Sequence, residues 1–273
     1  MHYDPIKNVI GNVARTSPLV RRIFYIVLGI MFLREWYVKR ALRKVLGGKR
    51  EPFMMFDAGS GFGQYSYYCA KQFPSATIYA VDVKEEQIAD CRFFFSKRKF
   101  NNVSFGVEDL TIPKHTNRFD FILSVDVMEH IQDDVQVFKN FFQALKPGGK
   151  VLINTPSNLG GSDAHDENET SFIGEHARNG YSVDDITRKL KSAGFQMEKV
   201  TYTYGPIGSV AWRLGIKYPM LMLNKSKLNF VLLPFYYILT LWLTLLLMYA
   251  DYKFPNTRGT GLLVVAAKSA SQR

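Results

Sequence analysis

Three glycines at every second position, Gly59, Gly61 and Gly63, make up the segment best suited to binding a ligand. Glycine has no Cβ and tolerates positive φ, so such a segment can turn sharply and bring its backbone against a ligand. The apolar residues before it predict a buried strand that runs into Asp57, and residues 65–72 predict a helix. The free N–H groups at the start of that helix favour an anion or a carboxylate.

Carboxylates at the ends of the next two expected strands extend this site. The strand 77–82 ends in Asp82, 19 residues after Gly63, where an acid can accept both hydroxyls of a ribose. The strand 103–107 is followed by Asp109, which can meet an adenine amino group. The sequence therefore predicts a nucleoside site, whose candidate residues beyond the turn are Asp82, Val83, Glu108, Asp109 and Leu110.

Further strands are expected over residues 119–125, 150–155, 198–204 and 262–267, with a turn at 145–149. Strands that alternate with helical segments are typical of an α/β domain, in which ligands bind at the carboxyl ends of the strands. Ser124 and Val125 close the fourth strand, so they are expected to line the floor of the same cleft.

The segments FDAGSGFG, VEDL, SVDVMEHI and LKPGGKVLINTP, with Asp82 at a strand end, resemble the class I S-adenosylmethionine-dependent methyltransferases, of the small-molecule type that includes ubiquinone and menaquinone methylation. The dehydrogenase fingerprint G-x-G-x-x-G is incomplete because position 64 is Gln. The resemblance implies a Rossmann-like, doubly wound, seven-stranded sheet whose last strand is antiparallel. It also implies S-adenosyl-L-methionine as the cofactor, with Asp57 and the glycine turn at its methionine end, Asp82 at the ribose and Asp109 at the adenine.

A polar segment follows the fifth strand, where an acceptor site is expected. His165 and His176 are candidate general bases there, with Glu175 as a group that orients one of them. An alternative is that Glu175, His176 and Arg178 only brace the segment on the next helix, which Ser182 and Asp185 are expected to cap. A metal site is not predicted, because the acids and histidines lack the i, i+4 spacing of helical ligands.

Charge is distributed unevenly along the chain. Residues 1–50 carry a net charge of +9 out of a total of +11, and they include the apolar run 23–33. Eleven residues are too few to span a bilayer, which needs about 20. Two interpretations of this segment stay open: basic helices on an anionic membrane surface, and helices that cover the cofactor cleft. No cleavage pattern of small residues follows the run, so a signal peptide is not expected.

A second apolar segment, residues 228–250, contains no charge and is long enough to cross a membrane. One crossing would leave residues 262–267 on the side opposite the sheet that they must join. Residues 206–227 are too polar to supply a second span. The options are a monotopic helix, a re-entrant hairpin that bends at Pro234, and a helix buried inside the protein or in a homodimer. We favour an insert over residues 206–261 that docks into one leaflet.

The expected organisation is therefore an N-terminal helical part (1–50), a methyltransferase domain (51–205 and 262–268) and a hydrophobic insert (206–261). Cys69 and Cys91 are too few for a disulfide framework or a thiolate zinc site. We predict methyl transfer to a small, apolar or lipid-like acceptor at the inner face of the cytoplasmic membrane. The alternatives are an RNA or protein methyltransferase that uses the basic N-terminus, and a cofactor-binding membrane scaffold. Nucleic acid is not the expected partner.

Overall fold

The computed structural model describes residues 17–160 and 177–270. Its centre is one seven-stranded sheet in the order β3-β2-β1-β4-β5-β7-β6. Strand β7 is antiparallel to both neighbours, β5 and β6, and the other pairs are parallel. The strands are β1 Phe53–Ala58, β2 Ala76–Asp82, β3 Val103–Val107, β4 Phe119–Val125, β5 Leu145–Pro156, β6 Gln196–Thr203 and β7 Gly261–Ala267.

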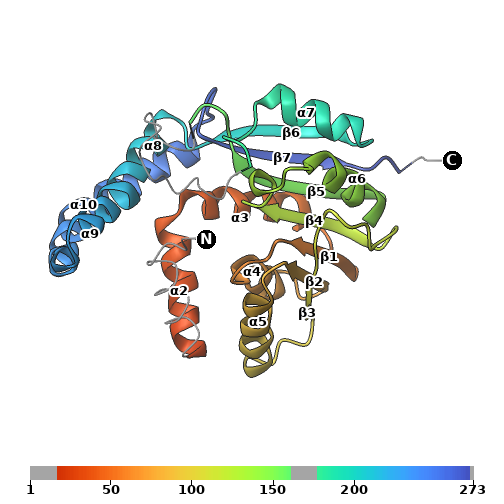
Figure 1. Ribbon diagram of the computed structural model, residues 1–273, viewed down its shortest axis with the longest axis horizontal. Coiled ribbons are helices and arrows are strands. Elements are labelled where there is room, and N and C mark those ends of the chain that lie inside the picture. Colours follow the sequence, from red (N-terminus) through yellow and green to blue (C-terminus); the bar gives the residue numbers. More distant parts are fainter. Residues whose placement is uncertain (1–16, 161–176, 271–273) are drawn as a thin grey trace.

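Helices cover both faces of the sheet (Figure 1). The α-helices are α2 Pro18–Met31, α3 Leu33–Leu46, α4 Gln64–Gln72, α5 Glu85–Lys97, α6 Asp134–Ala144, α7 Val183–Ser192, α8 Pro206–Trp212, α9 Tyr218–Lys225 and α10 Leu233–Lys253. Shorter helical segments are η1 Met128–His130, η2 Arg213–Lys217 and η3 Lys227–Val231. Ser182 caps α7 as expected, since its Oγ accepts the Asp185 N–H at 3.0 Å.

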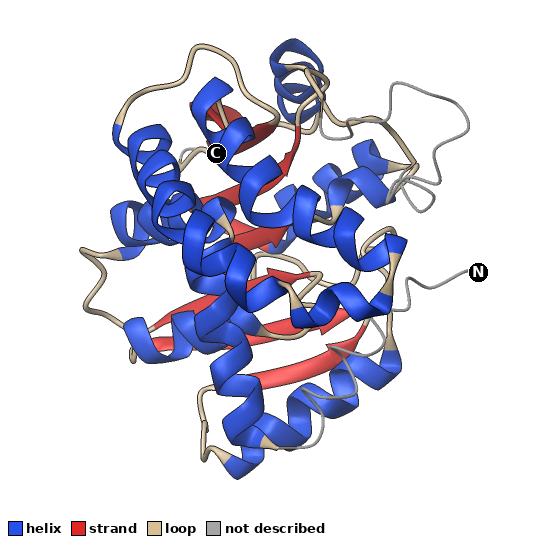
Figure 2. Cartoon of the chain, turned by 90° about the vertical axis from the view of Figure 1, so that its left-hand side faces the viewer, coloured by secondary structure: helices blue, strands red, loops and turns tan. Residues whose placement is uncertain are grey.

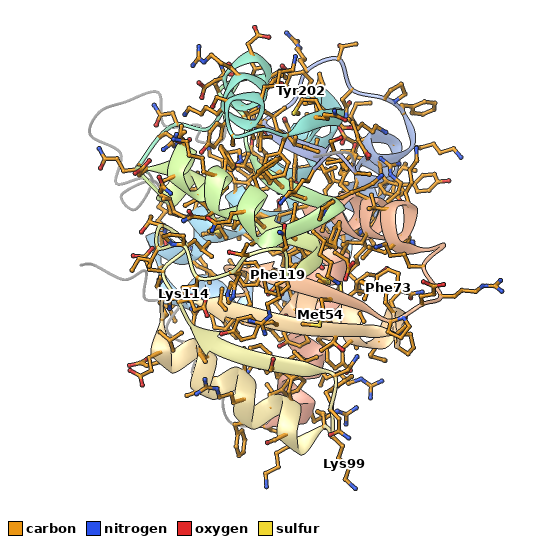
Figure 3. The ribbon with its side chains drawn as sticks, turned by 90° about the vertical axis from the view of Figure 1, so that its right-hand side faces the viewer. Met54, Phe73, Lys99, Lys114, Phe119 and Tyr202 are labelled. Atoms are coloured by element: carbon orange, nitrogen blue, oxygen red, sulfur yellow. The ribbon has the colours of Figure 1, made fainter. Side chains whose placement is uncertain are left out.

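Alternating residues of each strand enter the apolar cores on the two faces of the sheet, as the period of two in a strand requires. Phe56 of β1 packs with Phe138 of α6 on one face, and Met55 packs with Leu42 of α3 on the other. Met54 on β1 and Phe119 on β4 lie in mid-sheet, and Tyr202 marks the β6 edge (Figure 3). The strands are apolar on both sides because both faces are covered.

One local prediction was wrong. We expected a turn at residues 145–149 before the fifth strand, but β5 begins at Leu145. Phe119 pairs with Leu145 and Phe121 with Lys150, so residues 146–149 form a bulge opposite Asp120. The bulge is held from β7, because Gly148 N donates to Lys268 O at 3.0 Å and Lys268 N to Gly149 O at 2.9 Å. The Pro-Gly-Gly sequence fixes the irregularity, while the pairing with β7 keeps it in the sheet.

The insert between β6 and β7 is a helical hairpin. Residues 206–225 run outward as one helix through α8, η2 and α9, and α10 returns. Gly208 N donates to Asp251 Oδ2 at 2.9 Å at the foot, which is also fixed by the Tyr37 hydroxyl on Asp251. The hairpin extends away from the sheet on the side where α2 lies (Figure 1), and from that side helices stand in front of the strands (Figure 2).

The outward helix continues through a proline because side chains of the returning helix α10 donate hydrogen bonds to the carbonyls that the proline leaves without a partner. Pro219 has no N–H for the Gly215 carbonyl, and the preceding segment widens into a π-helix. Tyr237 OH donates to Gly215 O at 2.9 Å, and Tyr236 OH donates to Leu214 O at 2.7 Å. The bend at Pro234 that the re-entrant option required is absent, since this proline lies in the first turn of α10, where a proline is tolerated. The chain reverses earlier, through η3.

Candidate active site at the carboxyl ends of the strands

The glycine turn joins β1 to α4 in the conformation that its composition predicts. Gly59, Gly61 and Gly63 have φ values of 85°, 51° and 75°. A Cβ on Gly59 would lie 2.2 Å from Cγ2 of Val127, so both its φ and its surroundings require glycine. The turn is tied to β2, because the N–H groups of Gly59 and Ser60 donate to Val81 O at 2.9 and 2.8 Å.

Asp57 is the penultimate residue of β1, and Asp82 is the last residue of the neighbouring strand β2. Asp57 is buried and accepts the Ser66 hydroxyl at 2.5 Å. Burial raises the pKa of Asp57 to about 6, and the Ser66 hydrogen bond opposes that rise. Asp82 accepts the N–H of Gly61 with Oδ2 and that of Lys84 with Oδ1, both at 3.0 Å. Each oxygen of Asp82 keeps a further acceptor position for a hydroxyl.

The residues expected at the nucleoside end lie in three different environments. Val83 is 61% exposed at the end of β2, which suits contact with an apolar ring. Asp109 is exposed, and its Oδ1 accepts both the N–H and the hydroxyl of Thr111, which lowers the pKa of Asp109. Glu108 instead accepts the Tyr79 hydroxyl at 2.7 Å and contacts His115 at 3.1 Å. Leu110 is a core residue. The geometry therefore suits Val83 and Asp109 better than Glu108 and Leu110.

A cavity of about 190 Å³ lies at the carboxyl ends of β4 and β5, beside the strand that carries the glycine turn. The sheet, the α2–α3 junction and the foot of the hairpin all line it. Its lining includes Phe32, Arg34, Asp126, Asn154, Thr155, Pro156, Tyr204, Ser209, Trp212 and Arg213. Ser124 and Val125 are the last two residues of β4, directly before Asp126, and the Ser124 side chain is fully buried.

Arg34 and Asp126 form an ion pair inside this cavity. Asp126 has a φ of 53°, in the left-handed region, and it is held by Asn154, whose Nδ2 donates to Asp126 Oδ1 at 3.0 Å. Arg34 N donates to the Tyr204 hydroxyl at 3.0 Å. Among the residues described, Arg34 Nε and Asn154 Oδ1 are buried and have no hydrogen-bond partner. Such atoms are costly to bury unless a ligand or water satisfies them.

Glu129 is a second acid close to the cavity, and it was not among the site residues predicted from the sequence. It is buried behind Thr155, whose hydroxyl donates to Glu129 Oε2 at 3.1 Å. Burial raises the pKa of Glu129 to about 7, against the opposing hydrogen bonds and the positive charges of Arg34 and Arg178. A shifted carboxyl next to a cleft is a common feature of functional sites.

The predicted catalytic residues His165, Glu175 and His176 lie outside the described residues. Over residues 17–160 and 177–270, no group of three or more His, Cys, Asp or Glu side chains could hold a metal ion. Asp57, the glycine turn, Asp82, Val83, Asp109, Ser124 and Val125 lie at or beyond the carboxyl ends of the strands, whereas Glu108 binds Tyr79 and Leu110 belongs to the core. Arg34 was not predicted, because nothing in its local sequence marks it.

The sequence profile of a methyltransferase domain matches residues 53–194, just over half of the chain. The chain belongs to this methyltransferase domain family. The predicted family is therefore confirmed, together with the Rossmann-like fold, its antiparallel last strand and S-adenosyl-L-methionine as the family's cofactor.

Similar proteins act on different acceptors, as their names state. Phosphoethanolamine N-methyltransferase 1 of Triticum aestivum is 31% identical over 148 residues, which cover 52% of this chain and 28% of that protein. Malonyl-[acyl-carrier protein] O-methyltransferase 2 of Ilyobacter polytropus is 25% identical over 163 residues, covering 56% and 61%. The chain thus spans less than a third of the length of the Triticum relative that it matches.

A solved structure with a similar fold is that of phosphoethanolamine N-methyltransferase 2 of Haemonchus contortus, in complex with phosphomonomethylethanolamine and S-adenosylhomocysteine. Its TM-score is 0.62 at 22% identity, over 95% of this chain and 59% of that one. At this identity the similarity shows the fold alone.

The residues of the site fit the family's cofactor. Asp82 can accept ribose hydroxyls, and the start of α4, which follows Gly63 without a described side-chain cap, presents N–H groups to a carboxylate. Among the described atoms, none lies within 4 Å of a Cβ built on Gly61, so the turn is open above that residue. The buried hydroxyls of Ser60 and Ser124 have no described partner and can serve as further hydrogen-bonding groups.

Proposed function

We propose that the chain transfers a methyl group from S-adenosyl-L-methionine to a small, apolar or lipid-like acceptor at the inner face of the cytoplasmic membrane. The cavity is the observation that carries this proposal. It is lined from one side by Asp126 and Asn154, at the carboxyl ends of β4 and β5, and from the other by Trp212 at the foot of the hairpin. An acceptor bound there would lie between the donor site and the apolar hairpin.

When bound, the cofactor supplies a methyl group on a sulfonium. A bond forms from the acceptor atom to that methyl carbon while the carbon–sulfur bond breaks, and the electron pair stays on sulfur. The chain must hold the acceptor in line in a site that excludes water. Asp126 is the acid that lines the cavity, so it can take the proton of a hydroxyl or amine acceptor and orient it. Phe32 and Trp212 offer flat apolar surfaces for the rest of the acceptor.

The hairpin supports the membrane part of the proposal. Helix α10 has 21 residues and contains an 18-residue stretch with a mean hydropathy of 1.7, of which only 11% is buried. Trp242, Leu239 and Phe235 are each more than 60% exposed on it. Apolar surface of this extent on a soluble protein marks an interaction site. Because β7 must return to the sheet, a hairpin that enters one leaflet fits the connectivity better than a crossing.

A polar acceptor is the second candidate. Arg34 and Arg213 both line the cavity, and guanidinium groups suit phosphate or carboxylate groups. The phosphoethanolamine N-methyltransferases among the relatives make a small phosphorylated amine the natural form of this candidate.

The test is a transfer assay with methyl-labelled S-adenosylmethionine and three separate extracts: membrane lipids, aqueous metabolites and total RNA. We expect the label in the organic phase. Label in the aqueous fraction would favour the polar acceptor, and label in RNA would revive a nucleic-acid role for the basic N-terminus. A protein that binds the donor without transferring label to any extract would fit the scaffold alternative. A protein that stays dimeric and soluble without detergent would favour burial of α10 in a homodimer.

A further inference from the structure

Helix α2 has two sides with different contacts. Its outward side carries Leu19, Ile23, Ile26, Val27 and Ile30, all of them exposed. Its inward side carries Arg21 and Tyr25, which are buried. The helix begins at Ser17, whose Oγ accepts the Leu19 N–H at 3.2 Å, with Pro18 in its first turn. A helix with this division is amphipathic, but its apolar side faces away from the domain.

The inward side of α2 contacts the glycine turn directly. Arg21 Nη2 donates to Phe62 O at 2.7 Å, and the Tyr25 hydroxyl donates to the same carbonyl at 2.5 Å. Arg21 also donates to Asp90 O at 2.9 Å and to Cys91 Sγ at 3.0 Å on α5. Phe62 lies between Gly61 and Gly63, so α2 fixes the backbone of the turn that holds the donor.

These contacts orient α2 as well as the turn. Arg21 Nε donates to the Tyr25 hydroxyl at 2.8 Å, and the Tyr25 ring packs edge-on against Phe94 with centroids 5.6 Å apart. A guanidinium with several directed donors fixes an orientation that a lysine ammonium does not. Any force that holds α2 in place therefore also holds the turn.

The outward sides of α2 and of the hairpin have the same chemistry. Exposed apolar residues continue along the hairpin. Residues 206–250 contain four basic residues and no Asp or Glu, and residues 18–31 contain Arg21 and Arg22 and no acid. The one acid of the hairpin, Asp251, is buried at its foot. Gly215 on η2 lies near α2, since a Cβ there would be 3.9 Å from Met31 Cε. The two elements also lie on the same side of the molecule (Figures 1 and 2).

We propose that the outward side of α2 docks, together with the hairpin, on an anionic bilayer leaflet, and that docking strengthens donor binding because Arg21 and Tyr25 hold the glycine turn. The apolar side chains enter the acyl boundary, while the cations, Arg22 and Lys225 among them, meet anionic headgroups. This inference rests on the membrane part of the proposed function. It adds that the membrane acts on the donor site as well as supplying an acceptor.

The expected size of the effect follows from linkage. If the leaflet favours the orientation of α2 that fixes the turn, donor and leaflet must strengthen each other by the same factor. Couplings of this kind are typically fivefold or more, so we expect donor affinity to rise about fivefold on vesicles. The same factor should appear as tighter vesicle binding at saturating donor.

The experiment titrates S-adenosylmethionine into the full chain, alone and with vesicles of phosphatidylcholine and phosphatidylglycerol, after flotation has confirmed that the protein is bound. Its readout is donor binding, so the absence of methyl transfer to any acceptor would not affect it. Equal donor affinity with and without vesicles, for protein that floats, would overturn the coupling. A protein that does not float would overturn the docking surface. Flotation that is no stronger on anionic than on pure phosphatidylcholine vesicles would contradict the anionic occupant.

Matched variants separate the two sides of α2. Arg21→Lys keeps the charge but loses the fork of donors, and Tyr25→Phe removes only the hydroxyl, so it remains informative if the first variant folds poorly. Both should float and lose the vesicle-dependent gain in donor affinity. Arg188→Lys, an exposed arginine on α7 outside the docking surface, is the matched control and should keep the gain. Retention of the full gain by both Arg21→Lys and Tyr25→Phe would overturn the role of these contacts.

Discussion

Asp82 connects the glycine turn with the residues after β2, because its two oxygens accept the N–H groups of Gly61 and Lys84. Both oxygens remain available to a ribose. We expect Asp82→Ala to weaken binding of S-adenosylmethionine by about 1–3 kcal/mol, since it removes charge-assisted hydrogen bonds. Isothermal titration measures this loss. Asp184→Ala, at an exposed position on α7, is the control and should bind as the wild type does. Unchanged affinity in Asp82→Ala would refute the ribose assignment.

Glu129 makes the stability of the protein depend on pH. Its pKa in the fold is about 7, above the ordinary value of 4.5, so the fold disfavours the ionised form. Its contribution is complete below pH 4.5 and is lost as the pH rises through 7. Glu129→Gln cannot ionise. Between pH 5 and pH 8 its free energy of unfolding should therefore fall less than that of the wild type, by on the order of 1–3 kcal/mol.

Denaturant titrations at the two pH values measure this difference. Glu51→Gln, on the exposed segment before β1, is the control and should follow the wild type. A pH dependence in Glu129→Gln as steep as that of the wild type would show that another group is responsible.

Residues with a local signature were predictable, and residues brought in from a distance were not. Asp57 and Asp82 lie at the ends of strands and the three glycines follow one, so their positions come from the pattern of strands and turns. Arg34 reaches the cavity only because α3 packs against one face of the sheet. The position of its partner Asp126 depends on an unusual φ of 53°. Neither the packing nor that φ is written in the neighbouring residues.

At the scale of elements, the β1–α4 connection depends on Gly59. Alanine there would adopt a φ of 85°, and its Cβ would meet Val127 at 2.2 Å. The left-handed conformation alone costs roughly 1–2 kcal/mol, and the clash adds to it. We expect Gly59→Ala to lower the free energy of unfolding by at least about 2 kcal/mol and to impair donor binding. Denaturant unfolding and donor titration measure the two effects.

Gly48→Ala is a suitable control, because no described atom lies within 4 Å of a Cβ at that position. Its stability should change little. If Gly59→Ala were as stable as Gly48→Ala and bound the donor normally, the turn would not need its observed conformation.

The hairpin was predictable as an apolar insert between β6 and β7, but its pairing of two long helices was not. The uncharged run 228–250 indicated one long helix, and α10 is that helix. Residues 206–227 are too polar to supply a second membrane span, and of the described helices only α10 is long and apolar enough for one. Pro219 and the polar residues of this segment did not predict a second long helix either. The structure forms one because Tyr236 and Tyr237 satisfy the two carbonyls freed in the π-helical segment. That compensation depends on contacts between the two arms, which no single segment reveals.

For the whole molecule, the strand order and the direction of β7 follow from the resemblance, whereas the relation of the cavity to the hairpin appears only in three dimensions. Ser209 and Trp212 belong to the insert, yet they line the same cavity as Asp126 and Asn154 of the sheet. The insert therefore completes the candidate acceptor site in addition to presenting apolar surface. The central claim about the molecule is that this cavity connects the donor site at the carboxyl ends of the strands with the apolar hairpin.

A blocking substitution tests that claim most directly. Ser209 is half-buried on α8 and lines the cavity, whereas Val210 next to it is exposed and does not. We expect Ser209→Phe to fill the cavity and to abolish transfer of labelled methyl groups to the membrane-lipid extract while leaving S-adenosylmethionine affinity unchanged. Val210→Phe should transfer label as the wild type does. Wild-type transfer by Ser209→Phe would contradict the account, because the acceptor would then bind elsewhere.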